Sequence, residues 1–204
     1  MLWDVAHGQL RQTLGDALDL NSVHSVAYRS DGFALATGSF DGTLILWDAE
    51  SGQKQLTIED HADWITAVAF SPDGNRLATA SADGSVMVRD AITGQKQFVL
   101  QGFADRVTSV AFAANSKTLA SVNVGGLALW DAVTGEQHPV KLNGSTDNQE
   151  AANVGGDNAG LIAFDPAGTS VVVVGDSVVL WSVDSDPVGS AVNAGSIANR
   201  LATQ

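Results

Sequence analysis

The sequence predicts an all-β protein assembled from one repeated unit of four short strands. The first observation is a recurring ending, an aromatic or basic residue followed by aspartate, at steps of 44, 42, 41 and 51 residues. These endings stand at Trp3-Asp4, Trp47-Asp48, Arg89-Asp90 and Trp130-Asp131, with a degenerate copy at Trp181-Ser182. The second observation is that no part of the chain repeats apolar residues with the 3.6-residue period of a long amphipathic helix. A period near 40 residues is typical of repeat proteins.

Each strand of the unit follows from its own sequence pattern. The first ends in VAFSPDG (68–74), whose Pro-Asp-Gly suits a tight turn. The second, LATAS (77–81), runs into Asp83-Gly84, a hairpin signal because glycine tolerates positive φ. The third, such as TLILW (43–47), is almost continuously apolar, which predicts that both of its faces are covered. The fourth, such as QKQLTI (53–58), alternates and is expected to be half exposed.

The phrase from His61 to Val86 carries a family resemblance, because it combines HADWITAVAFSPDG with LATASADGSV. It resembles the WD-repeat β-propeller family, and the likeness extends over roughly residues 1–183 with its landmarks in phase. The resemblance implies four-stranded sheets, called blades, arranged around a central channel. The expected layout is a half-blade at 1–14, blades at about 23–58, 65–100, 107–142 and 160–192, a flexible insertion at 143–159 and a C-terminal tail at 193–204. The outer strand of the last blade is expected around Val188–Val192.

This layout is a partial, open propeller of about four blades plus an N-terminal half-blade. Propellers have roughly 4–8 blades, and members of the resembled family usually have seven. Three explanations are open at this point: a fragment of a larger protein, a half-propeller that pairs with another chain, and a gene start placed too late. An isolated open propeller would leave sheet faces and strand edges uncovered, which favours self-association.

Composition narrows the classes of function. With 10 Lys and Arg against 23 Asp and Glu, the net charge of −13 disfavours binding to nucleic acid or to anionic membrane surfaces. The chain has no cysteine, which removes disulfides, thiolate nucleophiles and cysteine-rich zinc sites. The histidines are scattered, and neither a nucleophile elbow nor a phosphate-binding loop occurs, so we expect no enzyme activity, metal or cofactor. The N-terminus lacks a signal-peptide pattern, so we expect a soluble, cytoplasmic protein.

The family resemblance also implies a buried polar network in each blade, made of His, Ser or Thr, Asp and Trp. A buried indole N–H needs an acceptor, and a satisfied network makes a blade rigid. The matching residues are Thr37, Asp41 and Trp47 in blade one, His61, Thr79 and Asp83 in blade two, Ser121 and Trp130 in blade three, and Trp181 in blade four. No blade has the full set, because Asp19 and Phe103 stand at histidine positions and Arg89 at a tryptophan position. Arg89 is expected to pair with Asp83 or Asp90, the alternative being an anion-binding role.

The resemblance implies, in addition, a platform that binds partners on the face around the channel. The corresponding positions are Ser22, Trp64, Arg106 and Asn158 before the inner strands, and Phe40 and Ala82 before the hairpins. Trp64 and Phe40 are candidate anchors, since aromatic residues and arginine are favoured at interfaces. The alternative is that Trp64 packs beneath a loop and Phe40 covers the hairpin.

The expected function is therefore a non-catalytic protein–protein interaction scaffold or sensor module, with a protein partner of basic or mixed charge. The resemblance to bacterial repeats suggests a link to signalling. Two other functions stay open: a truncated fragment of a larger WD-repeat signalling protein with no independent function, and a propeller enzyme that uses titratable residues around its channel.

Overall fold

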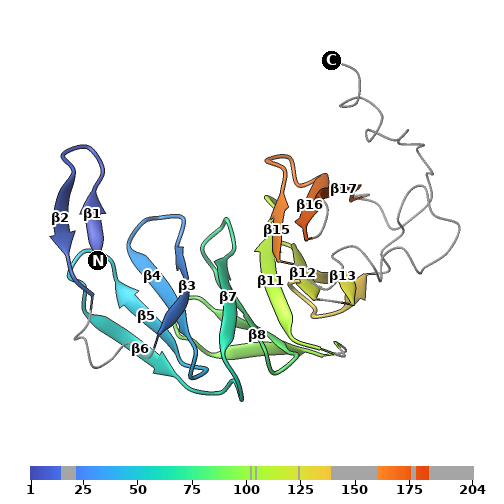
Figure 1. The fold of residues 1–204 in the computed structure, drawn as a ribbon, viewed down its shortest axis with the longest axis horizontal. Helices are drawn as coiled ribbons and strands as arrows, with labels where there is room; N and C mark the ends of the chain where they lie inside the picture. Colours follow the sequence, from blue (N-terminus) through green and yellow to red (C-terminus); the bar gives the residue numbers. More distant parts are fainter. Residues whose placement is uncertain are drawn as a thin grey trace, which may run out of the picture.

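The computed structural model describes residues 1–14, 22–101, 103, 105–123, 125–138, 160–175 and 178–183, with only the backbone of residues 181 and 182. The sheets follow one another along an open arc, with an N-terminal hairpin at one end and the last sheet at the other (Figure 1). This part of the chain contains strands and turns but no helix. The predicted all-β, partial-propeller architecture is confirmed.

Every sheet is antiparallel, and its strands pair in chain order. The N-terminal hairpin consists of β1 (Leu2–Asp4) and β2 (Gln9–Gln12). The first sheet consists of β3 (Val23–Tyr28), β4 (Ala34–Ser39), β5 (Leu44–Asp48) and β6 (Lys54–Ile58). The second consists of β7 (Ile65–Phe70), β8 (Arg76–Ser81), β9 (Val86–Asp90) and β10 (Lys96–Leu100). The third consists of β11 (Val107–Phe112), β12 (Thr118–Asn123), β13 (Gly126–Asp131) and β14 (Gln137–His138). The fourth consists of β15 (Leu161–Phe164), β16 (Ser170–Val174) and β17 (Val178–Ser182).

The recurring aspartate organises the turn that follows the third strand of each unit. The Oδ1 atom of Asp48 accepts hydrogen bonds from the backbone N–H groups of Glu50 and Ser51, at 3.0 and 2.7 Å. Asp90 and Asp131 do the same two and three residues ahead of themselves. A carboxylate that holds its own downstream backbone in this way is a standard turn device. The Trp-Asp ending therefore combines a core residue with a turn-forming residue.

Neighbouring sheets pack face to face, and the cores of the molecule lie between them. Val68 and Ile65 of the second sheet pack with Leu44 and Leu46 of the first. Hydrogen bonds join adjacent inner strands: the Val68 N–H donates to Ser25 Oγ at 3.0 Å, and the Thr66 hydroxyl donates to the Val107 carbonyl at 2.6 Å. The arc is thus a chain of sheets in which each unit stabilises the next.

A glycine permits the closest of these approaches. A Cβ atom on Gly38, in β4, would lie 2.4 Å from Cγ2 of Ile65 in the next sheet. No carbon pair tolerates that separation, so the second sheet can sit where it does only because position 38 has no side chain.

Some of the expected features lie outside the described residues. These are Asp19, Asn158, the Trp181 side chain, the outer strand at Val188–Val192, the insertion at 143–159 and the tail at 193–204. Within the described ranges, no helix of the length and apolar character needed to cross a membrane occurs.

Candidate functional site

The second sheet contains a buried polar network built from three of the expected residues. His61 Nε2 lies 2.8 Å from Thr79 Oγ1, and His61 Nδ1 lies 2.9 Å from Asp83 Oδ2. Asp83 also accepts hydrogen bonds from the Ala62 N–H and from the N–H and hydroxyl of Ser85. The network fastens the hairpin between β8 and β9 to the segment that leads into β7.

The environment of this network shifts both of its titratable groups. Burial lowers the pKa of His61 below its ordinary value, and it outweighs the opposing effect of Asp83. Burial raises the pKa of Asp83, but the hydrogen bonds from Ser85 and His61 outweigh it, so that the pKa of Asp83 lies below its usual range. His61 is therefore neutral and Asp83 ionised at neutral pH, which suits a fixed hydrogen-bonding role.

The first and third sheets keep a shorter version of the same network. The Trp47 indole N–H donates to Thr37 Oγ1 at 2.9 Å, and the Trp130 indole N–H donates to Ser121 Oγ at 2.8 Å. In the first sheet, Asp41 accepts the Thr43 N–H at 3.0 Å within the hairpin. Each buried indole has the acceptor that it needs.

Arg89 takes the tryptophan position in the second sheet, but its partner differs from the prediction. The guanidinium pairs with Asp60, not with Asp83 or Asp90, and Asp60 in turn accepts a hydrogen bond from Lys96 Nζ at 3.0 Å. Burial raises the pKa of Asp60, but the hydrogen bonds from Arg89 and Lys96 outweigh it and leave this pKa lowered. The prediction was wrong because Asp83 is already held by His61, and Asp90 by its turn.

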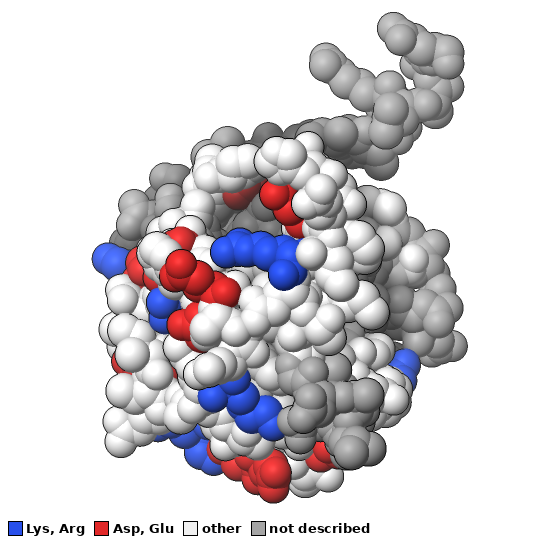
Figure 2. All heavy atoms as spheres, turned by 90° about the vertical axis from the view of Figure 1, so that its left-hand side faces the viewer, with Lys and Arg blue, Asp and Glu red and all other residues white. Residues whose placement is uncertain are grey.

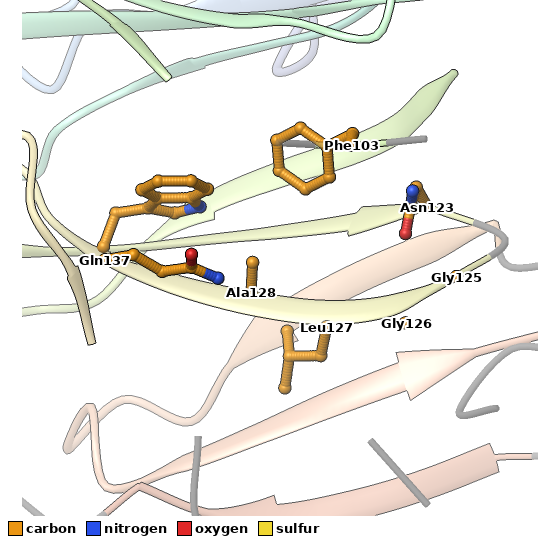
Figure 3. A pocket seen from close by; sticks show the side chains of 8 residues that line it. Phe103, Asn123, Gly125, Gly126, Leu127, Ala128 and Gln137 are labelled. Carbon is orange, nitrogen blue, oxygen red and sulfur yellow. The ribbon is translucent and has the colours of Figure 1, made fainter. Parts of the chain in front are cut away.

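The third sheet, which lacks the histidine and the hairpin aspartate of the second, contains a pocket. Phe103 stands where His61 does in the second sheet, and its ring lies 5.7 Å from that of Trp130. The pocket, of about 250 Å³, lies between Phe103 and the strand β13 that carries Ala128 (Figure 3). Its lining is completed by Asn123, Gly125, Gly126, Leu127, Trp130 and Gln137.

An aromatic cluster joins the first two sheets at one face of the arc. The rings of Phe40 and Trp64 stack with centroids 4.5 Å apart and planes 22° apart. His24 lies against both, 5.4 Å from Phe40 and 5.2 Å from Trp64. Phe40 is half exposed and Trp64 partly buried. We call His24, Phe40 and Trp64 the aromatic cluster.

The backbone fixes the loops that carry this cluster. The Phe40 N–H donates to the Ser22 carbonyl at 3.2 Å, and in the next sheet the Ala82 N–H donates to the Trp64 carbonyl at 3.0 Å. In each of these two sheets, a backbone hydrogen bond thus joins the residue before the hairpin to the residue before the inner strand. These are the two classes of position that were expected to contact a partner. Arg106, at the equivalent place before β11, is exposed.

His24 is the member of the cluster that sequence reasoning missed. It follows Val23, which pairs with Ser39 directly before Phe40. The register of the first two strands of the unit was the available signal, because it brings positions 24 and 40 to the same end of the sheet.

Within the described part of the chain, no three His, Asp or Glu side chains are placed so that they could hold a metal ion together.

Comparison with known proteins matches two of the repeats to one family. Residues 8–48 and 52–90 match the family model described as WD domain, G-beta repeat. These two stretches of the chain are WD repeats. The first matched WD repeat runs from β2 to β5 and the second from β6 to β9, so each begins with an outer strand and ends with a third strand. No curated protein matches the sequence.

Solved structures with a similar fold include U3-55K, the RRP9 WD40 repeats and a computationally designed protein. The chain resembles the structure of U3-55K with a TM-score of 0.68 at 19% identity, over 79% of this chain and 49% of that one. It resembles the RRP9 WD40 repeats with a TM-score of 0.67 at 19% identity, over 79% and 48%. The computationally designed Ika4 protein gives 0.69 at 23% identity, over 87% of this chain and 99% of that one. The chain thus spans about half the length of the two natural structures and nearly all of the designed one.

Proposed function

We propose that this protein is a non-catalytic interaction module that captures a protein partner on the face carrying the aromatic cluster. WD40 repeats are modules of the protein–protein interaction kind, and the single observation that carries the proposal is the stacked pair Phe40 and Trp64. Large aromatic rings that remain partly exposed on a rigid scaffold are favoured anchors at protein interfaces. The pair spans two sheets, so a bound segment would contact both blades.

The charges beside the cluster favour a basic or mixed-charge partner segment. Asp63 and Asp105 are exposed, and they directly precede Trp64 and Arg106 at the starts of two inner strands. With the net charge of −13, they favour lysine- or arginine-bearing peptides and disfavour nucleic acid and anionic membranes. Arginine and lysine also interact well with aromatic rings such as the half-exposed Phe40 and the partly exposed Trp64. A cytoplasmic scaffold in signalling is the setting we propose for this activity.

An array of immobilised peptides that range from acidic to basic tests this proposal. The purified chain should bind basic peptides that contain apolar residues, and Trp64→Ala should weaken that binding at least about tenfold. Phe33→Ala is the matched control, because Phe33 is an exposed aromatic residue in the turn between β3 and β4. Equal losses in the two variants, or a preference for acidic peptides, would contradict the proposal. A circular-dichroism melt separates lost binding from lost folding.

A further inference from the structure

The first sheet exposes a face that its counterparts bury. The repeated segments VAY (26–28), VAF (68–70) and VAF (110–112) place a valine and an aromatic residue on each inner strand. Val68 is 7% exposed, and Val110 and Phe112 are 6% and 9% exposed, because each packs on the preceding sheet. Val26 and Tyr28 are 59% and 51% exposed.

The described part of the N-terminal hairpin explains this difference. It lies against Leu35, Ile45 and Trp47 through Leu2 and Leu14, and so it covers the outer part of the first sheet. Its two strands include no inner strand that could cover Val26 and Tyr28. Within the described residues, no inner strand of a preceding sheet covers these two side chains.

The fourth sheet exposes the face that, in the other three sheets, packs against the next sheet. Leu127 and Leu129, on the third strand of the third sheet, are 8% and 7% exposed because they pack on the fourth sheet. The equivalent residues of the fourth sheet, Val178 and Leu180, are 72% and 49% exposed. Among the described residues, no sheet follows the fourth one to cover these side chains.

We propose that two copies of this chain associate head to tail, so that the fourth sheet of each covers the first sheet of the other. At each junction between sheets inside the chain, the third strand of one sheet packs against the inner strand of the next sheet. The two exposed faces are of these same two kinds. Two identical junctions related by a twofold axis close a ring. Four sheets with inner strands in each copy make an eight-bladed ring, within the range of roughly 4–8 blades that propellers adopt.

The surface at the N-terminal end of the arc is compatible with such a contact. Figure 2 views the molecule from that side, and scattered charges of both signs lie there among extensive uncharged surface. A contact at this end would therefore not place one continuous patch of like charge against the other copy.

In the closed ring, β2 also pairs with a different strand. The matched WD repeats place β2 and β6 equivalently, so β2 is an outer strand whose inner strands belong to a preceding blade. The fourth sheet has three described strands and no described outer one. Its third strand reads VVLWS, and β1 reads LWD, so the two share a Leu-Trp pair at the same place. In the ring, β17 of one copy replaces the three-residue β1 of the other beside β2.

Sedimentation or light scattering of the purified full chain tests the proposal. We expect a concentration-dependent dimer with twice the 21.1 kDa mass of one chain. Val26→Glu and Leu180→Glu should each raise the dimer dissociation constant at least about tenfold, because each puts a charge into an apolar junction. Ile92→Glu is the matched control, since Ile92 is 69% exposed in the turn between β9 and β10. These strands belong to the second sheet, and the proposed junction involves only the first and fourth sheets. This variant should leave the dissociation constant unchanged.

A mixing experiment separates head-to-tail pairing from other modes. A mixture of the Val26→Glu and Leu180→Glu chains restores one intact junction per pair, so it should dimerise more tightly than either variant alone. If first sheets paired with each other instead, Leu180→Glu would dimerise like the wild type, and head-to-tail pairing would be wrong. A wild-type chain that stays monomeric at concentrations of about 100 μM would also overturn the proposal.

A separate variant tests whether β17 of one copy replaces β1 of the other beside β2. Leu2→Asp weakens the packing of β1 on the first sheet, and it should leave the dimer as tight as before or make it tighter. A weaker dimer in this variant would mean that β1 keeps its place and that the exchange is wrong. Neither result depends on the aromatic cluster, so Trp64→Ala should dimerise normally even though it loses peptide binding.

Discussion

At the scale of single residues, the buried histidine of the second sheet links the fold to pH. His61 makes two side-chain hydrogen bonds as a neutral imidazole and is almost fully enclosed. Its pKa is lowered by burial, so the folded state resists its protonation more than the unfolded chain does. Because the pKa of His61 is lowered in the folded state, this residue contributes stability above the ordinary pKa of 6.5, and that stability is lost as the pH falls below it.

We predict that the free energy of unfolding declines as the pH is lowered from about 7 to about 5. His61→Gln should lower stability at neutral pH by about 1–3 kcal/mol, because it disturbs a buried hydrogen-bonded pair. It should also remove most of the decline between those two pH values. Denaturant titrations across the pH range measure both effects. His7→Gln, at an exposed position, should retain the wild-type profile, and a decline that persists in His61→Gln would assign it to other groups.

At the scale of one element, strand β13 differs from its counterparts by a smaller side chain. Ala128 occupies the position that Ile45 has in the first sheet and Met87 in the second. Together with the replacement of histidine by Phe103, this small residue leaves the pocket of the third sheet. Side chains that line this pocket, which is partly open to solvent, have fewer packing partners than they would against a larger residue at position 128.

We predict that Ala128→Ile stabilises the chain by about 1 kcal/mol, because it buries additional side-chain surface against Phe103 and Trp130 and adds a β-branched residue to a strand. Ala120→Ile is the matched control, since Ala120 is a fully buried alanine of the same sheet that is packed against the fourth. Overpacking there should destabilise by about 1–3 kcal/mol. Thermal melts compare the two variants, and a lower melting temperature for Ala128→Ile would show that the pocket cannot accept the side chain.

The elements themselves could be predicted from the sequence because their signals are local. Asp48 and Asp90 hold turns by contacts within three residues, and an apolar run such as LILW is buried on both faces. The partner of Arg89 could not be predicted, because Asp60 lies 29 residues away and the nearer carboxylates have other partners. The contact of His24 with Trp64 also depends on how two sheets pack, which no strand pattern contains.

At the scale of the whole molecule, stability depends on neighbours. The inner strands β3, β7, β11 and β15 lie side by side in chain order along the arc, and each core lies between two adjacent sheets. A protein of this kind is close to one-dimensional, so its stability is a sum of unit and junction contributions. The second and third sheets have a neighbouring sheet on both faces, whereas Val26 and Val178 lie on faces that no further four-stranded sheet covers within the described residues.

This arrangement predicts a gradient of amide hydrogen exchange along the chain. At low protein concentration, amides of β8 and β12 should exchange slowest, and those of β3 and β15–β17 fastest, because the end sheets open without disturbing a second junction. If the end faces pair between copies, raising the concentration should slow exchange in β3 and β15–β17 and leave β8 unchanged, since binding stabilises only the states that bind. Val26→Glu supplies the control, because it should abolish the concentration dependence while keeping the gradient. Equal slowing in every sheet would instead mean that the chain unfolds as a single unit and that its ends are no weaker than its centre.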